Sequence, residues 1–376
     1  MDNLTHTLFG LTLARTPLGR VGRGATAALI LGSNVPDIDF VAASGGALKY
    51  LEWHRGPTHG VLGVAGLGLA VAALVNIGVR KQDSHQTSAP RASFLSLWTV
   101  AMVGAVCHVL MDLPTSYGTR FLSPFDWHWF AQDWLPIVDI YLLTILSAGL
   151  WIGRRTVTDP VPSSKVIWGP RERGAAVALL FVAMNYGLRA TTHHLAIQRA
   201  SQLFGSMLPQ PCADGSAPVL VDRWPTDAGS APHGARRCLV EIAAMPSFLS
   251  PFHWRVIAQL SDAYELRDLD LLARRIGDSR NGRDVFWSAS RWYPNIWTAA
   301  VLQAAPARAA QTFLGFSRFP AARSFVDQEG RATVRWTDMR FATGELGSQR
   351  TRQRDFFTVT VRVNAEGGVE QEGLGP

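Results

Sequence analysis

The sequence predicts an α-helical membrane domain, with about four transmembrane helices and N-terminal interfacial helices, followed by an α+β soluble domain. Three observations predict this arrangement. Four long apolar runs lie before residue 190, period-two alternation appears after residue 200, and 47% of the 376 residues are hydrophobic while only 17% are charged. This composition is too apolar for an ordinary soluble enzyme. We therefore expect a membrane domain over residues 1–195 and a soluble domain over residues 200–376.

The four apolar runs are long enough, or nearly so, to cross a bilayer. They cover residues 61–79, 94–113, 135–153 and 174–190. Ahead of them, residues 3–15 predict an amphipathic helix that ends at Thr16-Pro17, because the residue before a proline is disfavoured in a helix. Residues 24–34 predict a short apolar helix that Pro36 stops. We expect these two helices to be interfacial or re-entrant.

The C-terminal part of the chain has the alternating pattern of antiparallel strands. Strand-like segments cover residues 218–224, 252–260, 332–341 and 356–365. Residues 294–316 predict a pair of helices. Cys212 and Cys238 lie 26 positions apart in this part. They are expected to form a disulfide if it faces an oxidising compartment, and two free thiols fit equally well.

Basic residues predict the orientation of the membrane domain. The formal charge is +7, yet no long Lys/Arg run exists, so the pattern argues against a nucleic-acid partner. Basic side chains concentrate in loops 80–93 and 154–173, which share one membrane face if four helices span. The positive-inside rule places these loops in the cytoplasm, although several basic residues among the first 57 oppose it. We expect the N-terminus, loop 114–134 and the C-terminal domain on the outer face.

Ligand-type side chains stand at the ends of the apolar runs that share this outer face. They precede the first run, stand near the start of the third, and end or follow the second and fourth, so topology alone gathers them into one layer. Ionisable groups at membrane depth are costly and usually mark a function. The residues are His54, Arg55, His59, His108, Asp112, Asp139, His193 and His194.

Two short spacings have the chemistry of metal ligands. His108 and Asp112 are four apart, so both project from one stripe of a helix. The alternative is a helix-end pair satisfied by water or by an intrahelical hydrogen bond. Asp37 and Asp39 follow Pro36 and face the same way in an extended stretch. They would bridge two cations, or one would bind while the other orients a histidine; the alternative is a capped turn.

The stretch "HRGPTHG" brings His54 and His59 together around a turn at Gly56-Pro57. Arg55 would point at an anionic group, because its planar fork suits phosphate or carboxylate. Thr58 is expected to cap the following helix. The alternative is an interfacial anchor with incidental histidines. A lone histidine such as His6 is usually a surface or core residue, and it becomes a ligand candidate only beside the others.

Imidazoles and carboxylates without thiolates suit zinc, with manganese or iron as alternatives. The number of candidates is enough for a two-metal site, which activates a water and clamps the leaving oxygen in ester or phosphoester hydrolysis. Asp126 and His128, in loop 114–134, are second-tier candidates. No nucleophile elbow, P-loop or dinucleotide motif stands in a fitting context.

Four motifs then carry a resemblance to a known family. The order "MDNLTH", "PDID", "HRGPTHG" and "HVLMD" resembles the YdjM/YbcI-like bacterial inner-membrane proteins, described as membrane-bound metal-dependent hydrolases, over roughly residues 1–150. Gly60 replaces the serine of the family pattern. The ligand order is also distantly similar to zinc-dependent phospholipase C and P1 nuclease, which implies a phosphoester substrate. The metal-site set implied by the family resemblance is His6, Asp37, Asp39, His54, His59, His108 and Asp112.

The leading hypothesis is an inner-membrane hydrolase that cleaves an ester or phosphoester, such as a lipid, at the bilayer surface. Asp37 is expected to be the general base or a second ligand, and Arg55 to neutralise the developing anion. The alternatives are a non-enzymatic metal-binding protein, either a sensor or a transporter, and a membrane assembly protein. The oligomeric state stays open. Six residues are expected to hold the divalent metal, namely His6, Asp39, His54, His59, His108 and Asp112.

Overall fold

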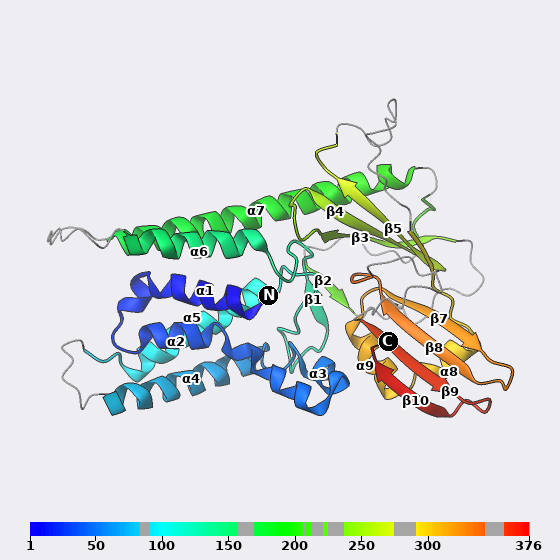
Figure 1. The fold of residues 1–376 in the computed structure, drawn as a ribbon, viewed down its shortest axis with the longest axis horizontal. Coiled ribbons are helices and arrows are strands. Elements are labelled where there is room, and N and C mark those ends of the chain that lie inside the picture. Colours follow the sequence, from blue (N-terminus) through cyan, green and yellow to red (C-terminus); the bar gives the residue numbers. More distant parts are fainter. Residues whose placement is uncertain are drawn as a thin grey trace. The chain divides into compact units, whose positions relative to one another are not determined.

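A computed structural model describes residues 1–82, 90–155, 169–205, 208–212, 221–224, 237–273, 291–342 and 357–375. They form two compact units, Met1–Val41 with Trp53–Ala190, and Ala42–Glu52 with Thr191–Pro376. The first unit is helical and the second is built mainly of antiparallel sheet (Figure 1). A helical N-terminal half followed by a β-sheet region is the order that the sequence predicts.

The first unit is a bundle of helices joined by short irregular segments. The 3₁₀ segment η2 (Val35–Gly45) and the short helix α3 (Ala47–Trp53) connect the second helix to the fourth. A further 3₁₀ turn, η1 (Pro17–Arg20), follows the first helix, and loop 114–134 contains the short strand β1 (Trp129–Ala131). The main helices are α1 (Asn3–Ala14), α2 (Ala25–Gly32), α4 (Val61–Gln82), α5 (Phe94–Asp112), α6 (Ile140–Arg155) and α7 (Pro170–Phe204), the last of which continues into the second unit.

Three helices among the described residues are long and apolar enough to cross a membrane, rather than the predicted four. They are Val61–Lys81, Phe94–Asp112 and Arg171–Phe204. The remaining apolar helix covers only Ile140–Ile152. It starts five residues later than predicted because Asp139 accepts hydrogen bonds from the backbone N–H groups of Tyr141 and Leu142, at 2.9 and 3.0 Å, and so caps the helix.

The two N-terminal helices, predicted to be interfacial or re-entrant, pack against the other helices of the bundle. Helix α1 contacts α2 and α6, and α2 contacts α4 and α5. Glycines allow this close approach: a Cβ atom on Gly32 would lie 2.4 Å from the carbonyl oxygen of Ala101, and one on Gly104 would lie 2.8 Å from that of Leu29. Small residues commonly permit such backbone contact between membrane helices. This packing brings the start of η2 against the end of α5.

The second unit contains two four-stranded antiparallel sheets. The first has the order β3-β4-β5-β6, and the second the order β10-β9-β8-β7. Helices α8 (Ala299–Ala304) and α9 (Arg308–Phe316) contact strands of the second sheet. The strands are β3 (Leu239–Pro246), β4 (His253–Leu260), β5 (Ala263–Asp270), β6 (Arg291–Pro294), β7 (Pro320–Val326), β8 (Ala332–Asp338), β9 (Thr358–Val363) and β10 (Val369–Leu374).

These elements confirm the strands predicted at 252–260, 332–341 and 356–365 and the helix pair at 294–316. The segment predicted at 218–224 lies partly outside the described residues, and its end forms the short strand β2 (Asp222–Trp224). Cys212 and Cys238 form a disulfide, with their Cα atoms 5.0 Å apart. The sequence was compatible with a disulfide or with two free thiols, and the structure has the disulfide.

Candidate metal centre

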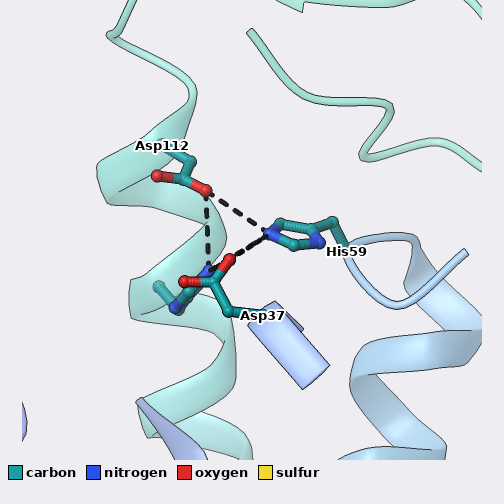
Figure 2. Close-up of side chains that lie close together, drawn as sticks. Asp37, His59 and Asp112 are labelled. Atoms are coloured by element: carbon teal, nitrogen blue, oxygen red, sulfur yellow. Dashed lines mark hydrogen bonds and ion pairs between the residues drawn. The ribbon is translucent and has the colours of Figure 1, made fainter. Parts of the chain in front are cut away.

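Four buried side chains from three segments converge in the first unit (Figure 2). Asp37 comes from η2, His59 from the turn before α4, and His108 and Asp112 from the last turns of α5. The Nε2 atom of His59 lies 3.2 Å from Nε2 of His108, and 3.4 Å from Oδ1 of Asp37 and from Oδ2 of Asp112. Nε2 of His108 lies 3.5 Å from each of these carboxylate oxygens.

These separations match the edges of a tetrahedron around a metal ion. Zinc bonds to nitrogen and oxygen of about 2.0–2.2 Å place tetrahedral ligand atoms roughly 3.3–3.6 Å apart. An octahedral site with bonds of about 2.1 Å would place adjacent ligand atoms only about 3.0 Å apart. The five separations fall between 3.2 and 3.5 Å. The geometry therefore fits a four-coordinate ion better than an octahedral one.

Hydrogen bonds behind the two histidines decide which ring nitrogen faces the cluster. Nδ1 of His108 lies 2.8 Å from the carbonyl oxygen of Ser33, which can only accept, so Nδ1 carries the hydrogen. Nδ1 of His59 lies 3.1 Å from the hydroxyl oxygen of Thr58 and 3.4 Å from Oδ2 of Asp39. The Thr58 hydroxyl donates to that same carboxylate, at 3.0 Å, so its oxygen accepts from His59. Both Nε2 atoms therefore present lone pairs to the cluster.

The carboxylates add only further lone pairs. Oδ2 of Asp112 is buried and, within the part of the chain that the structure describes, has no hydrogen-bond partner. Oδ1 of Asp37 lies 3.4 Å from Nε2 of His59 and 3.5 Å from Nε2 of His108, so it too faces lone pairs rather than donors. Four buried acceptor atoms facing one another are unfavourable without a positive charge among them. The donor set therefore fits a divalent cation.

Asp39 organises the turn that presents His59. Its Oδ1 accepts from Nδ1 of His54 at 3.0 Å, and its Oδ2 accepts from the backbone N–H of Arg55 at 2.7 Å as well as from Thr58. Arg55 has a φ of +53°, a left-handed conformation that is uncommon for a residue other than glycine. Burial raises the pKa of Asp39, but the contacts with His54 and His59 outweigh it and keep that pKa low. Asp37, Asp39 and His54 also place one ligand atom each within 4.8 Å of one another.

Arg55 is buried and directed at the outer oxygen of Asp112. Its Nη2 lies 3.1 Å from Oδ1 of Asp112, and its Nη1 donates to the hydroxyl of Thr115 at 3.3 Å and to the carbonyl of Gly118 at 3.1 Å. The guanidinium carbon lies 4.8 Å from the centre of the Tyr117 ring. Asp112 thus gives one oxygen to Arg55 and the other to the four-atom cluster.

His6 packs beside the cluster and contacts two of its residues. Its ring stacks on that of His108, with centroids 3.7 Å apart and planes 19° apart, and its Nε2 lies 3.5 Å from Oδ1 of Asp112. The amino group of Met1 also contacts this oxygen. Neither ring nitrogen of His6 has a hydrogen-bond partner among the described residues. Burial, with His108 alongside, places the pKa of His6 well below its usual value, so the ring is neutral.

Other predicted polar residues make separate contacts. Asp126 and His128 contact each other at 2.5 Å, and Asp139 forms a buried ion pair with Arg189 at 2.9 Å. The ring of His193 stands 5.4 Å from that of Trp254, and His194 lies 2.8 Å from Gln198.

Sequence reasoning missed the carbonyl of Ser33, the hydroxyl of Thr115 and the amino group of Met1. No pattern marks a carbonyl or a hydroxyl as the partner of a distant side chain. Thr58 was expected to cap a helix, yet its hydroxyl bonds to Asp39.

Comparison with known proteins places the chain in a family. Residues 1–196 match the family described as YdjM inner membrane protein. A stretch of 161 residues is 26% identical to the uncharacterized protein YfhP of Bacillus subtilis (strain 168); the match covers 40% of this chain and 46% of that protein. The chain therefore spans about half the length of this relative, and no solved structure matches it. Since the family match covers more than half of the sequence and confirms the resemblance of the four motifs, the chain belongs to the YdjM inner membrane protein family.

Proposed function

We propose that this chain is a membrane-bound, metal-dependent hydrolase that cleaves an ester or phosphoester at the bilayer surface. The observation that carries the proposal is the set of four buried lone-pair atoms, in which five separations match tetrahedral spacing. Two imidazoles and two carboxylates form a donor set that suits zinc, with manganese or iron as alternatives. A bound ion of this kind would supply Lewis acidity; because the four side chains already fill a tetrahedral site, a water or substrate oxygen would bind as a fifth ligand, a coordination number that zinc can reach.

The contacts support specific roles for the residues. Asp37, His59, His108 and Asp112 are the proposed ligands. Of the two roles predicted for Asp37, general base or second ligand, we therefore propose the ligand. The three remaining candidate ligands, His6, Asp39 and His54, surround this set.

The neighbouring charges have supporting roles in this scheme. Arg55 is directed at Asp112, which fits a residue that orients the ligand rather than one that contacts an anion. Asp39 fixes the turn that carries His54 and His59 through its hydrogen bonds. Carboxylates next to metal-binding histidines usually orient the histidine in this way. The side chain of His54 is 12% exposed, whereas that of its partner Asp39 is 3% exposed, so His54 lies closer to solvent.

Apolar side chains on the ligand-bearing segments support a lipid substrate. Ile38 and Phe40 alternate with the two aspartates of η2, and Phe40 is 63% exposed. Trp53 immediately precedes His54, and Trp127 lies beside the turn, since a Cβ atom on Gly56 would be 3.7 Å from its ring. These residues lie outside the candidate spans, where exposed aromatic side chains are typical of the membrane–water interface. A substrate held in the bilayer would meet the centre along this surface.

The disulfide supports the proposed orientation. Disulfides persist in oxidising compartments and are rare in the cytosol. The Cys212–Cys238 bond therefore favours the outer, periplasmic face for the second unit, as the positive-inside rule predicted. The start of α4 and the end of α5 share one face, and the second unit, which follows α7, lies on that face when the shorter apolar helix α6 also crosses the bilayer. We propose that the metal centre also lies at the outer surface of the inner membrane.

Elemental analysis combined with hydrolysis assays tests the proposal. The detergent-purified chain is expected to hold about one equivalent of zinc, manganese or iron, and to hydrolyse a generic phosphodiester or a phospholipid. His108→Ala should lose both the metal and the activity. His128→Ala is the matched control, because His128 is paired with Asp126 outside the four-atom cluster.

Two outcomes of this experiment would contradict the proposal in different ways. A wild-type chain without stoichiometric metal would remove the metal centre altogether. Metal that is bound by the wild type and lost in His108→Ala, but without turnover of any phosphodiester, phospholipid or carboxylic ester, would instead indicate a non-enzymatic metal-binding protein.

A further inference from the structure

The second sheet of the second unit has one face turned toward its helices and one turned away from them. The side chain of Glu372 in β10 marks the helix face, because its Oε2 accepts from the backbone N–H of Ala309 in α9 at 2.8 Å. Val361 in β9 lies opposite Glu372, and Val334 in β8 lies opposite Val361. Successive side chains of a strand point to opposite faces, so the residues next to these point away from α9.

Three arginines lie on the face that points away from α9. Arg335 in β8 is directly opposite Arg323 in β7, and its other neighbour across the sheet is Thr360 in β9. Arg362 is two residues further along β9, on the same face. Directly opposite residues have Cβ atoms about 4.5–5.5 Å apart, and diagonal neighbours about 7–8 Å. The three guanidinium groups can therefore reach one ligand.

Two of these arginines form no ion pair within the part of the chain that the structure describes. No carboxylate of the described residues pairs with Arg335 or Arg362, and Nη1 of Arg362 donates to Oε1 of Gln371 at 3.2 Å. Burial lowers the pKa of Arg323, which indicates that this guanidinium is partly withdrawn from water. Like charges directly opposite each other destabilise a sheet. An anion bound among the arginines would offset this repulsion.

The hydroxyl of Thr360 lies in the same row as Arg323 and Arg335. Its Oγ1 is buried and has no hydrogen-bond partner among the described residues. A buried polar group without a partner is unfavourable and requires an explanation. The hydroxyl can donate one hydrogen bond, and arginine can only donate. An acceptor placed among the guanidinium groups would therefore also satisfy this hydroxyl.

We propose that this face of the second sheet binds a phosphate group, held by the three arginines and the hydroxyl of Thr360. The planar fork of a guanidinium matches phosphate and carboxylate alike. Phosphate is favoured because a phosphate monoester has three strong acceptor oxygens and a charge of about −1.5 to −2 near neutral pH. A carboxylate has only two oxygens and one charge for the same donors. The proposal does not depend on the metal centre.

Calorimetric titration of the detergent-purified full chain with inorganic phosphate tests this site. The chain is first dialysed against a chelator, so that phosphate bound to a metal ion does not contribute. Arg335→Gln removes the central arginine, and Thr360→Val removes only the hydroxyl. Arg331→Gln is the matched control: it also removes one arginine, but Arg331 lies in the turn after β7, is 54% exposed and pairs with Asp327.

The wild-type chain is expected to bind about one equivalent of phosphate saturably. Arg335→Gln should weaken this binding at least about tenfold and Thr360→Val should weaken it less, because hydrogen bonds from charged groups contribute more than those from neutral groups. Arg331→Gln should bind phosphate like the wild type. Loss of a repelling arginine or of an unpartnered hydroxyl should not destabilise the sheet, and thermal unfolding of each variant checks this.

Three results would overturn the proposal. They are the absence of saturable phosphate binding, wild-type affinity in Arg335→Gln, and an equal loss of affinity in Arg331→Gln, which would indicate a general attraction to positive charge. Glycerol 3-phosphate and short-chain phosphatidylglycerol then compete with inorganic phosphate to identify the source of the group. Stronger displacement by the first indicates a soluble ligand and by the second a lipid headgroup, and either result supports a phosphate site.

Discussion

Two kinds of buried carboxylate occur in this molecule. Asp139, at the start of α6, accepts from Nη2 of Arg189 at 2.9 Å, and both side chains are fully buried. Asp338 in the second unit is similarly paired with Arg340, at 2.7 Å. Asp112 is equally buried, but its Oδ2 faces two imidazole nitrogens that present lone pairs.

The difference shows that burial alone does not identify a functional carboxylate. An aspartate paired with arginine has its charge compensated by the chain itself, and removal of one partner exposes an uncompensated charge. Asp112 has compensating partners only at Oδ1, which contacts Arg55 and the amino group of Met1. Its Oδ2 faces Nε2 of His59 and Nε2 of His108, and this side of the carboxylate needs a cation from outside. The neighbours of each oxygen therefore distinguish the proposed ligand Asp112 from Asp139, although both stand at helix ends of the first unit.

The largest expected effect comes from a matched pair of substitutions. Asp112→Asn should abolish stoichiometric metal binding, because it replaces one of the four proposed ligands, whereas Asp139→Asn should leave metal content unchanged. Structural zinc sites bind with roughly 10–16 kcal/mol at neutral pH, so the loss should be evident by elemental analysis. Equal metal loss in both variants would show that the comparison between the two aspartates is wrong.

The second expected effect concerns stability rather than metal. Arg189→Met should leave Asp139 buried without its partner and destabilise the fold by about 3–5 kcal/mol. Thermal unfolding in detergent measures this change, and metal content per folded chain should stay at the wild-type level. Arg340→Met tests the corresponding pair in the second unit. Wild-type stability in Arg189→Met would mean that this buried pair contributes little.

The smallest expected effect distinguishes Asp39 from the ligands. Asp39→Asn should weaken metal affinity by about 10–100-fold, because residues behind a metal-binding histidine orient it without binding the ion. This corresponds to about 1.4–2.8 kcal/mol. The visible spectrum of the cobalt-substituted protein should keep its tetrahedral character. A changed coordination spectrum would instead place Asp39 among the ligands.

Much of this centre could be predicted from short spacings. The four-residue interval between His108 and Asp112 fixes a common stripe on any helix. The alternation of apolar runs and polar ends predicted that segments far apart in sequence would meet at one membrane face. The same reasoning also placed Asp139 and His193 in the group of candidate ligands, although they contact other residues. Topology predicts on which membrane face a residue lies, but not which residues it contacts there.

The sequence by itself determined the helical membrane part, the later antiparallel strands and the set of candidate ligands, since periodicity and spacing act within single elements. Only the tertiary structure decided that α1 and α2 pack inside the bundle and that Asp37 and Asp39 have different neighbours. It also decided which oxygen of Asp112 faces Arg55. These outcomes depend on hydrogen bonds from distant groups, such as the carbonyl of Ser33, and on close helix contacts at Gly32. Such interactions join residues that no local pattern relates.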